Sequence, residues 1–127
     1  MILDTDIMVW VLKEYSPALR FVDSIPPGAR NLSVVTYLEL LYGAHDTKDL
    51  RSVKALVTDA FAEVIPANEA ISRAATRLME EFVLGNRIGV DDAFIAATAL
   101  ERHEPLATGN QKHFRFIPGL ELKIFRP

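Results

Sequence analysis

The sequence MILDTDIMVWVL, at residues 1–12, changes from one hydrophobic pattern to another within a few positions. Residues 1–5 contain a short apolar run that predicts a buried strand ending at Asp4. Residues 7–12 are apolar on every side and predict a short helix, with Asp6 as its candidate N-cap. A helix of this kind needs cover on more than one side, from its own domain or from another chain.

The same alternation of strand and helix continues to the end of the chain. Further strands are expected at 31–35, 63–66, 105–108 and 120–125, and helices at 17–25, 36–44, 50–61, 68–85 and 93–102. No internal repeat, low-complexity segment or long linker divides the 127 residues. This pattern predicts one α/β domain over residues 1–127, with a mostly parallel sheet covered on both faces.

Composition narrows the class of protein. Hydrophobic residues make up 50% of the chain, which is enough for a core, and the absence of cysteine excludes disulfides and thiolate chemistry. The N-terminus has no basic region and no long apolar run, so we expect a cytoplasmic protein without signal peptide or membrane span. A net charge of −3 and a pI of about 5.6 argue against general polyanion binding. A nucleic-acid partner would therefore need a local patch or a metal ion.

Acidic and amide side chains recur where the predicted strands end. Asp4 ends the first strand, Glu39 follows the second, Asn110 follows the fourth, and Asp92 opens the helix before that strand. Ligand sites of parallel α/β sheets lie at the carboxyl ends of the strands, so we expect these groups at one edge. Clustered carboxylates repel one another unless they gather a cation, and oxygen ligands suit Mg²⁺ or Mn²⁺ rather than zinc. Such a site favours phosphodiester hydrolysis.

Each of these acids also has a structural interpretation. Thr36-x-x-Glu39 matches a capping box, in which Glu39 bonds back to the Thr36 N–H; because a carboxylate has two oxygens, this role does not exclude metal binding. Asp4 is suited to capping the turn after its strand. Either Asp91 or Asp92 is expected to cap the helix that follows, and helix geometry alone does not choose which one faces the site.

Four blocks of the sequence resemble a PIN-domain ribonuclease, and specifically the VapC-type toxin of a toxin–antitoxin pair. The blocks are ILDTD at 2–6, SVVTYLELLYGA at 33–44, DAFIAATA at 92–99 and TGNQKHF at 108–114, with a further match at 117–120. They occur in family order and cover essentially the whole chain. The resemblance implies a three-layer α/β/α sandwich whose central parallel sheet has the strand order 3-2-1-4-5.

The resemblance also implies roles for individual residues. It makes Asp4, Glu39 and Asp92 the metal-binding acids, and it favours Asp92 over Asp91 because the family acid directly precedes the Ala-Phe-Ile-Ala-Ala run. A fourth acid often follows the fourth strand in PIN domains, but this sequence has Asn110 there, which favours one tightly held ion. The expected supporting residues are Thr5, Asp6, Thr36 and Asn110, and the candidate RNA contacts are Lys112, His113 and Arg115.

The activity implied by the resemblance is Mg²⁺-dependent endonucleolytic cleavage of RNA, with Mn²⁺ expected to substitute. The implied partners are a small VapB-type antitoxin, which docks a segment across the site, and a second copy of the chain in a homodimer. The apolar run at 7–12, with Trp10, suits a surface covered by that second copy, although burial within the domain would explain it equally.

Two other functions remain open from the sequence. One is a PIN domain outside a toxin–antitoxin pair, either a nuclease in RNA processing or a binding scaffold without activity. The other is a receiver-like Mg²⁺-binding signalling domain. A receiver requires an aspartate at the end of a central strand and a lysine at the end of a later one. The third and fourth predicted strands instead end in Ile65-Pro66-Ala67 and in Thr108, which disfavours this function.

Overall fold

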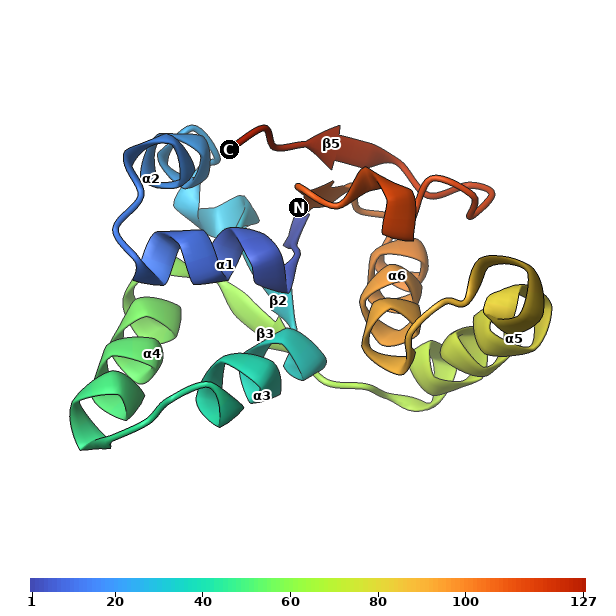
Figure 1. The fold of residues 1–127 in the computed structure, drawn as a ribbon, viewed down its shortest axis with the longest axis horizontal. Helices are drawn as coiled ribbons and strands as arrows, with labels where there is room; N and C mark the ends of the chain where they lie inside the picture. The colour runs from blue at the N-terminus through green and yellow to red at the C-terminus, as the bar shows by residue number, and fades with distance from the viewer.

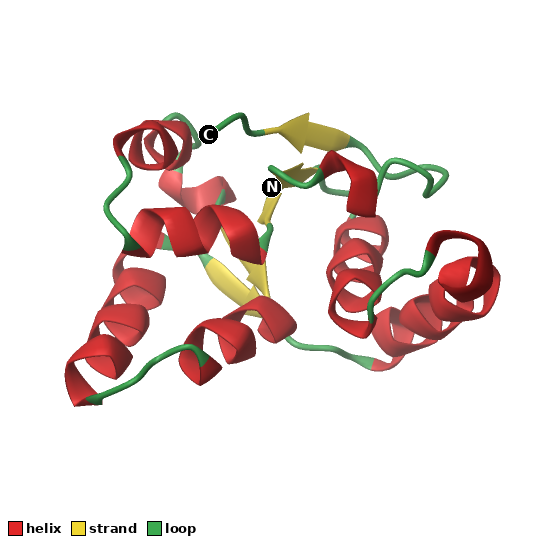
Figure 2. Cartoon of the chain, viewed as in Figure 1, coloured by secondary structure: helices red, strands yellow, loops and turns green.

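Five short parallel strands form the centre of the structure, with helices on both sides of the sheet (Figures 1 and 2). The computed structural model describes residues 1–127. The sheet order is β3-β2-β1-β4-β5 and every neighbouring pair is parallel, which confirms the predicted order 3-2-1-4-5. The elements are β1 (Ile2–Leu3), α1 (Thr5–Leu12), α2 (Ser16–Asp23), the 3₁₀ turn η1 (Pro27–Ala29), β2 (Asn31–Ser33), α3 (Val34–Tyr42), α4 (Thr47–Ala60), β3 (Glu63–Ile65), α5 (Glu69–Asn86), α6 (Val90–Arg102), β4 (Leu106–Thr108), the 3₁₀ turn η2 (Gln111–His113) and β5 (Leu122–Ile124).

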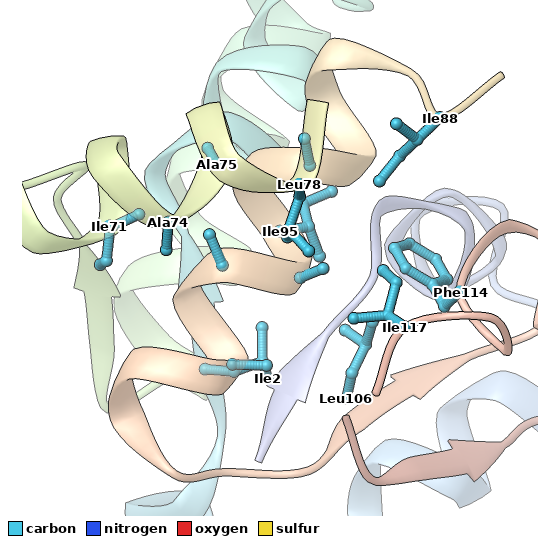
Figure 3. Close-up of a cluster of buried hydrophobic side chains, with 14 of the residues drawn as sticks. Ile2, Ile71, Ala74, Ala75, Leu78, Ile88, Ile95, Leu106, Phe114 and Ile117 are labelled. Atoms are coloured by element: carbon cyan, nitrogen blue, oxygen red, sulfur yellow. The ribbon is translucent and has the colours of Figure 1, made fainter. Parts of the chain in front are cut away.

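Two hydrophobic cores lie on opposite faces of this sheet. Ile2 and Leu106 face α5 and α6 and belong to the cluster drawn in Figure 3. Leu3 and Leu32 belong to a second cluster, formed with α1, α2, α3 and α4. Successive side chains of a strand point to opposite faces, so the two residues of β1 contribute one to each core. The predicted three-layer α/β/α sandwich is confirmed.

The helix α3 begins earlier than the capping-box pattern predicted. Its N-cap is Ser33, whose hydroxyl accepts a hydrogen bond from the Val35 N–H at 3.1 Å. Thr36 therefore lies inside the first turn, where it is fully buried. The predicted capping box between Thr36 and Glu39 is wrong, and Glu39 has a different partner.

The N-caps of α1 and α6 also differ from those predicted. Asp4, rather than Asp6, caps α1 by accepting the N–H of the next residue at 2.8 Å. Gly89 precedes α6, so Asp91 and Asp92 both lie in the first turn and neither is the cap. The carboxylates of these two aspartates are therefore not occupied by N-capping.

The most apolar helix, α1, is covered largely by its own domain. Ile7, Met8 and Val11 are buried, and the partly buried ring of Trp10 lies 4.7 Å from that of Tyr15. Burial within the domain thus accounts for most of this helix without a second chain. No helix in the structure combines the length and the hydrophobicity needed to cross a bilayer.

Candidate active site

Asp4 lies at the point where the central strand β1 ends. It is 4% exposed, its Oδ1 accepts the Thr5 N–H at 2.8 Å, and its Oδ2 accepts the Thr108 hydroxyl at 2.7 Å. Thr108 ends the neighbouring strand β4. The bond therefore joins β1 and β4, the two strands between which the strand order of the sheet reverses. Burial raises the pKa of Asp4 to about 7, and the nearby Asp6 carboxylate acts in the same direction.

Glu39 reaches this region from α3. Its Oε1 accepts the hydroxyl of Thr5 at 2.8 Å, and the Thr5 hydroxyl is also 3.1 Å from that of Thr36. Because Thr5 directly follows Asp4, this contact brings the second predicted acid beside the first. Burial raises the pKa of Glu39, and the negative charge of Asp91 adds to the effect.

Asp92 enters the site from the first turn of α6. The Nδ1 atom of His113 lies 3.1 Å from Oδ2 of Asp92, which makes an ion pair when the imidazole is protonated. Burial and the neighbouring Asp91 carboxylate raise the pKa of Asp92 to about 6, against the opposing effect of His113. Asp91 lines the same pocket and is more exposed than Asp92.

Asp6 connects α1 to the turn after β4. Its Oδ1 accepts the Ile7 N–H at 2.8 Å and its Oδ2 accepts the Gly109 N–H at 2.9 Å. A Cβ atom on Gly109 would lie 2.6 Å from Oδ2 of Asp6, so a larger residue there would have to displace this carboxylate. Burial raises the pKa of Asp6 as well. Asp6 therefore fixes the start of the loop that carries Asn110.

Most of the predicted site residues line one open pocket of about 390 Å³. Those in the pocket are Asp4, Thr5, Asp6, Asp92, Asn110, Lys112 and His113, together with Asp91. Glu39 lines an adjoining hollow, and Thr5 lines both. Two predicted residues line neither space: Thr36 is buried beneath Thr5, and Arg115 is exposed outside the pocket.

The groups in this pocket fit a hard divalent cation by their chemistry. Carboxylate and hydroxyl oxygens dominate, and the chain has no thiol. No three acidic or histidine side chains already lie at the mutual spacing of a metal site. Burial raises the pKa values of Asp4, Asp6, Glu39 and Asp92, and for three of them a neighbouring carboxylate adds to the effect, so a bound cation would favour their ionised forms.

Arg87 also lines the pocket, although the sequence analysis did not single it out. It is the C-cap of α5 and has a left-handed backbone conformation, with φ 53°. The available signal was the end of the helical pattern near Gly85. The pattern could not place the connection between α5 and α6, which contains Arg87, beside the loop after β4, because the two segments meet only through tertiary packing.

The fold and the pocket together define a class of protein. Carboxylates from the end of β1 and from the first turns of α1 and α6 gather in the pocket, and Glu39 of α3 lines the adjoining hollow. This is the edge where the order of the parallel strands reverses, which is the position of ligand sites in such folds. Acids gathered in this way, with oxygen donors and raised pKa values, are typical of a hydrolase acting on phosphodiesters.

Comparison with known proteins narrows this class to one family. The family described as "PIN domain" matches residues 1–118, and the chain belongs to this family of nucleases. It is 35% identical over 122 residues to "Ribonuclease VapC10" of Mycobacterium tuberculosis, a match covering 94% of this chain and 90% of that protein.

Solved structures agree with the sequence match. A toxin–antitoxin complex from Klebsiella pneumoniae has 25% identity and a TM-score of 0.79, covering 94% of this chain and 93% of that one. VapBC-1 from nontypeable Haemophilus influenzae has 25% identity and a TM-score of 0.78, covering 98% and 96%. The predicted resemblance to the VapC type of PIN domain is thus confirmed.

Proposed function

We propose that this protein is a Mg²⁺-dependent endoribonuclease and the toxin of a VapBC-type toxin–antitoxin pair. The observation that carries the proposal is the gathering of Asp4, Asp6 and Asp92 in one pocket, with the pKa of Asp4 raised to about 7 and that of Asp92 to about 6. Strongly shifted pKa values in a cleft are characteristic of functional sites. The relative from Mycobacterium tuberculosis is named a ribonuclease, which supports RNA as the substrate.

Asp4, Glu39 and Asp92 would hold the Mg²⁺ ion, for which Mn²⁺ is expected to substitute. When bound, the ion supplies positive charge to the scissile phosphate and lowers the pKa of a coordinated water. The chain places Asn110 where a fourth acid is common, and its uncharged amide adds no negative charge. This favours one firmly held ion over two.

Each of the three acids is oriented by a side chain beside it. Thr108 donates to the acid of β1, Thr5 donates to the acid of α3, and His113 lies against the acid of α6. These contacts limit the rotation of the three side chains, two of which line the pocket and one the adjoining hollow. Lys112 and Asn110 line the opening, where they are available to a phosphate group and to water.

Metal removal tests the chemistry of the proposal. The purified protein should cleave single-stranded RNA in Mg²⁺ or Mn²⁺, lose cleavage in EDTA, and regain it when the ion is restored. Glu39→Gln and Asp92→Asn should abolish cleavage, whereas Glu80→Gln, an exposed change on α5, should not. Undiminished cleavage in EDTA would refute metal dependence, and active forms of both site variants would refute the site.

The hollow beside the pocket supports the antitoxin part of the proposal. It is bordered by α1, α3 and α4, and Val9, Leu12, Leu40 and Val53 make it partly apolar, with Glu39 at its edge. A segment of a small protein lying there would extend across the site. The relative from Klebsiella pneumoniae was solved as a toxin–antitoxin complex, which agrees with such a partner.

Expression in a bacterial host separates the toxin from the other PIN functions. A toxin should arrest growth, and co-expression of a small protein encoded beside it should restore growth. A PIN nuclease of RNA processing should cleave RNA without growth arrest, and a binding scaffold should do neither. The receiver-like alternative is not supported, because receivers have the strand order 2-1-3-4-5 and this sheet has 3-2-1-4-5.

A further inference from the structure

Arg87 has an unfavourable backbone conformation at the edge of the acidic pocket. It caps the C-terminus of α5 with φ 53° and ψ 41°. This left-handed conformation is typical of glycine, and sometimes asparagine, because a Cβ atom is strained there. Gly85 and Asn86 stand just before it, so the suitable residue types occur one and two positions too early. Backbone preference therefore does not account for an arginine at this position.

The guanidinium of Arg87 has no acidic partner, although it belongs to a residue lining a pocket with four aspartates. Three other arginines form ion pairs with glutamates, namely Arg73, Arg77 and Arg102. The one side-chain hydrogen bond of Arg87 is from Nη1 to the Val83 carbonyl, at 3.3 Å and exposed to solvent. Most of its five N–H donors thus remain available to a ligand.

A second cation lines the same pocket from a different segment. Lys112 belongs to η2, after β4, whereas Arg87 belongs to the connection between α5 and α6. The chain as a whole is negative, with a net charge of −3, and the pocket carries four carboxylates. An RNA strand entering the pocket therefore needs local positive charge to offset repulsion. A guanidinium suits this task because its planar donors match two phosphate oxygens.

From this placement we infer that Arg87 binds a backbone phosphate of the RNA strand cut in the acidic pocket, next to the phosphate reached by Lys112. The inference rests on the proposed nuclease function. It makes Arg87 a substrate-binding residue.

An ordinary structural role for Arg87 makes the opposite predictions. A cation near a helix C-terminus interacts favourably with the helix dipole, and this one also bonds a carbonyl of the last turn. If that were its role, Arg87→Gly would lower the melting temperature and leave RNA affinity unchanged. If Arg87 binds phosphate, Arg87→Gly relieves the backbone and weakens RNA binding.

The experiment measures binding of a fluorescent single-stranded RNA by anisotropy in Mg²⁺. Asp4→Asn serves as the background that prevents cleavage. Adding Arg87→Gly should weaken binding about tenfold, as expected for one charge-assisted hydrogen-bonded contact. It should also reduce the slope of log Kd against log salt by about 0.7, the effect of one phosphate contact on a single strand. The melting temperature should rise by about 1–4 °C because the strained conformation suits glycine.

Two variants serve as matched controls. His103 caps α6 with φ 54° and lies outside the pocket, so His103→Gly should raise the melting temperature without changing RNA affinity. Arg51 is exposed on α4 and has no ion pair, so Arg51→Ala removes a positive charge elsewhere.

The outcomes separate this inference from the proposed function. The inference is overturned if the Asp4→Asn protein binds RNA and the same protein with Arg87→Gly binds it as tightly as the two control variants do. The nuclease proposal would still stand. If the wild-type protein neither binds nor cleaves RNA, the nuclease proposal fails, and the inference fails with it.

Discussion

Asp4 combines two roles that the sequence analysis treated as alternatives. It caps α1 through Oδ1, and it faces the pocket with Oδ2 bonded to Thr108. Each carboxylate oxygen has two lone pairs, so neither bond exhausts the capacity of its oxygen. Capping therefore positions the acid without preventing it from binding a cation, and the structural interpretation does not replace the chemical one.

Replacing Asp4 or Asp92 by asparagine should lower activity and at the same time raise stability. Asp4→Asn and Asp92→Asn should each abolish cleavage yet raise the stability of the EDTA-treated protein at pH 8 by roughly 1–2 kcal/mol, because each removes a charge that burial disfavours. Thermal unfolding in EDTA measures this effect, with the exposed change Asp59→Asn as the control. If both changes lower the melting temperature, the two acids serve as structural groups and the site assignment is wrong.

The same acids predict how stability depends on pH in the absence of metal. The pKa of Asp4 is about 7 and that of Asp92 about 6 in the folded state, against 3.8 for an unperturbed aspartate. Between about pH 4 and 7 the folded state therefore binds more protons than the unfolded state, and stability falls as pH rises. The melting temperature in EDTA should decrease from pH 5 to 7.5, and the double change Asp4→Asn, Asp92→Asn should flatten this decline. A melting temperature that rises over this interval would contradict the prediction.

At the scale of elements, the alternation of patterns located every strand and α-helix, but it placed the starts of α1, α3, α4 and α6 two or three residues too late. Ser33 and Thr36 are both suitable N-caps, and the sequence offers no local reason to prefer the first. The choice follows from the burial of Thr36 against Thr5, a contact between residues far apart in the chain. The strand order was likewise supplied by the family resemblance, because hydrophobic pattern alone does not order strands within a sheet.

In the site, too, some features could be predicted from local sequence, whereas others depend on tertiary packing. The acids could be predicted because each follows a strand or opens a helix, which is a local feature. The partners that hold them could not, because Thr108, Thr5 and His113 reach their acids only after the elements have packed. Arg87 escaped detection for the same reason.

The turn after β4 offers a test of how one element positions the site. Gly109→Ala should destabilise the protein by about 1–3 kcal/mol and reduce cleavage, because the new Cβ would lie 2.6 Å from Oδ2 of Asp6. Gly28→Ala is the control, since a Cβ there meets nothing within 4 Å and should change stability by less than about 0.5 kcal/mol. Urea unfolding measures both.

A double-mutant cycle identifies the cause of that destabilisation. Asp6→Ala removes the carboxylate that the new methyl group would meet, so it should recover part of the stability lost in Gly109→Ala. If the two losses simply add, the contact between these residues is not responsible.

At the scale of the whole molecule, the site is formed where both helical layers meet the central strands. Asp4 and Glu39 come from the layer of α1 and α3, whereas Asp92 comes from the layer of α5 and α6. The relative position of these acids therefore depends on how both cores pack against the sheet (Figure 1). This arrangement brings three acids that are far apart in the sequence to one edge of the sheet.

The predicted homodimer belongs to this scale as well, and α3 is the surface on which to test it. Leu38 and Tyr42 are one helical turn apart on α3 and are 56% and 93% exposed, which leaves apolar area uncovered in the monomer. We expect the protein to have twice its chain mass of 14.2 kDa by light scattering, and the double change Leu38→Glu, Tyr42→Glu to give a folded monomer. Leu84→Glu, on α5 at a residue 85% exposed, is the control and should remain dimeric. A wild-type monomer would exclude the homodimer, and a dimer that survives the α3 changes would place its interface on another face.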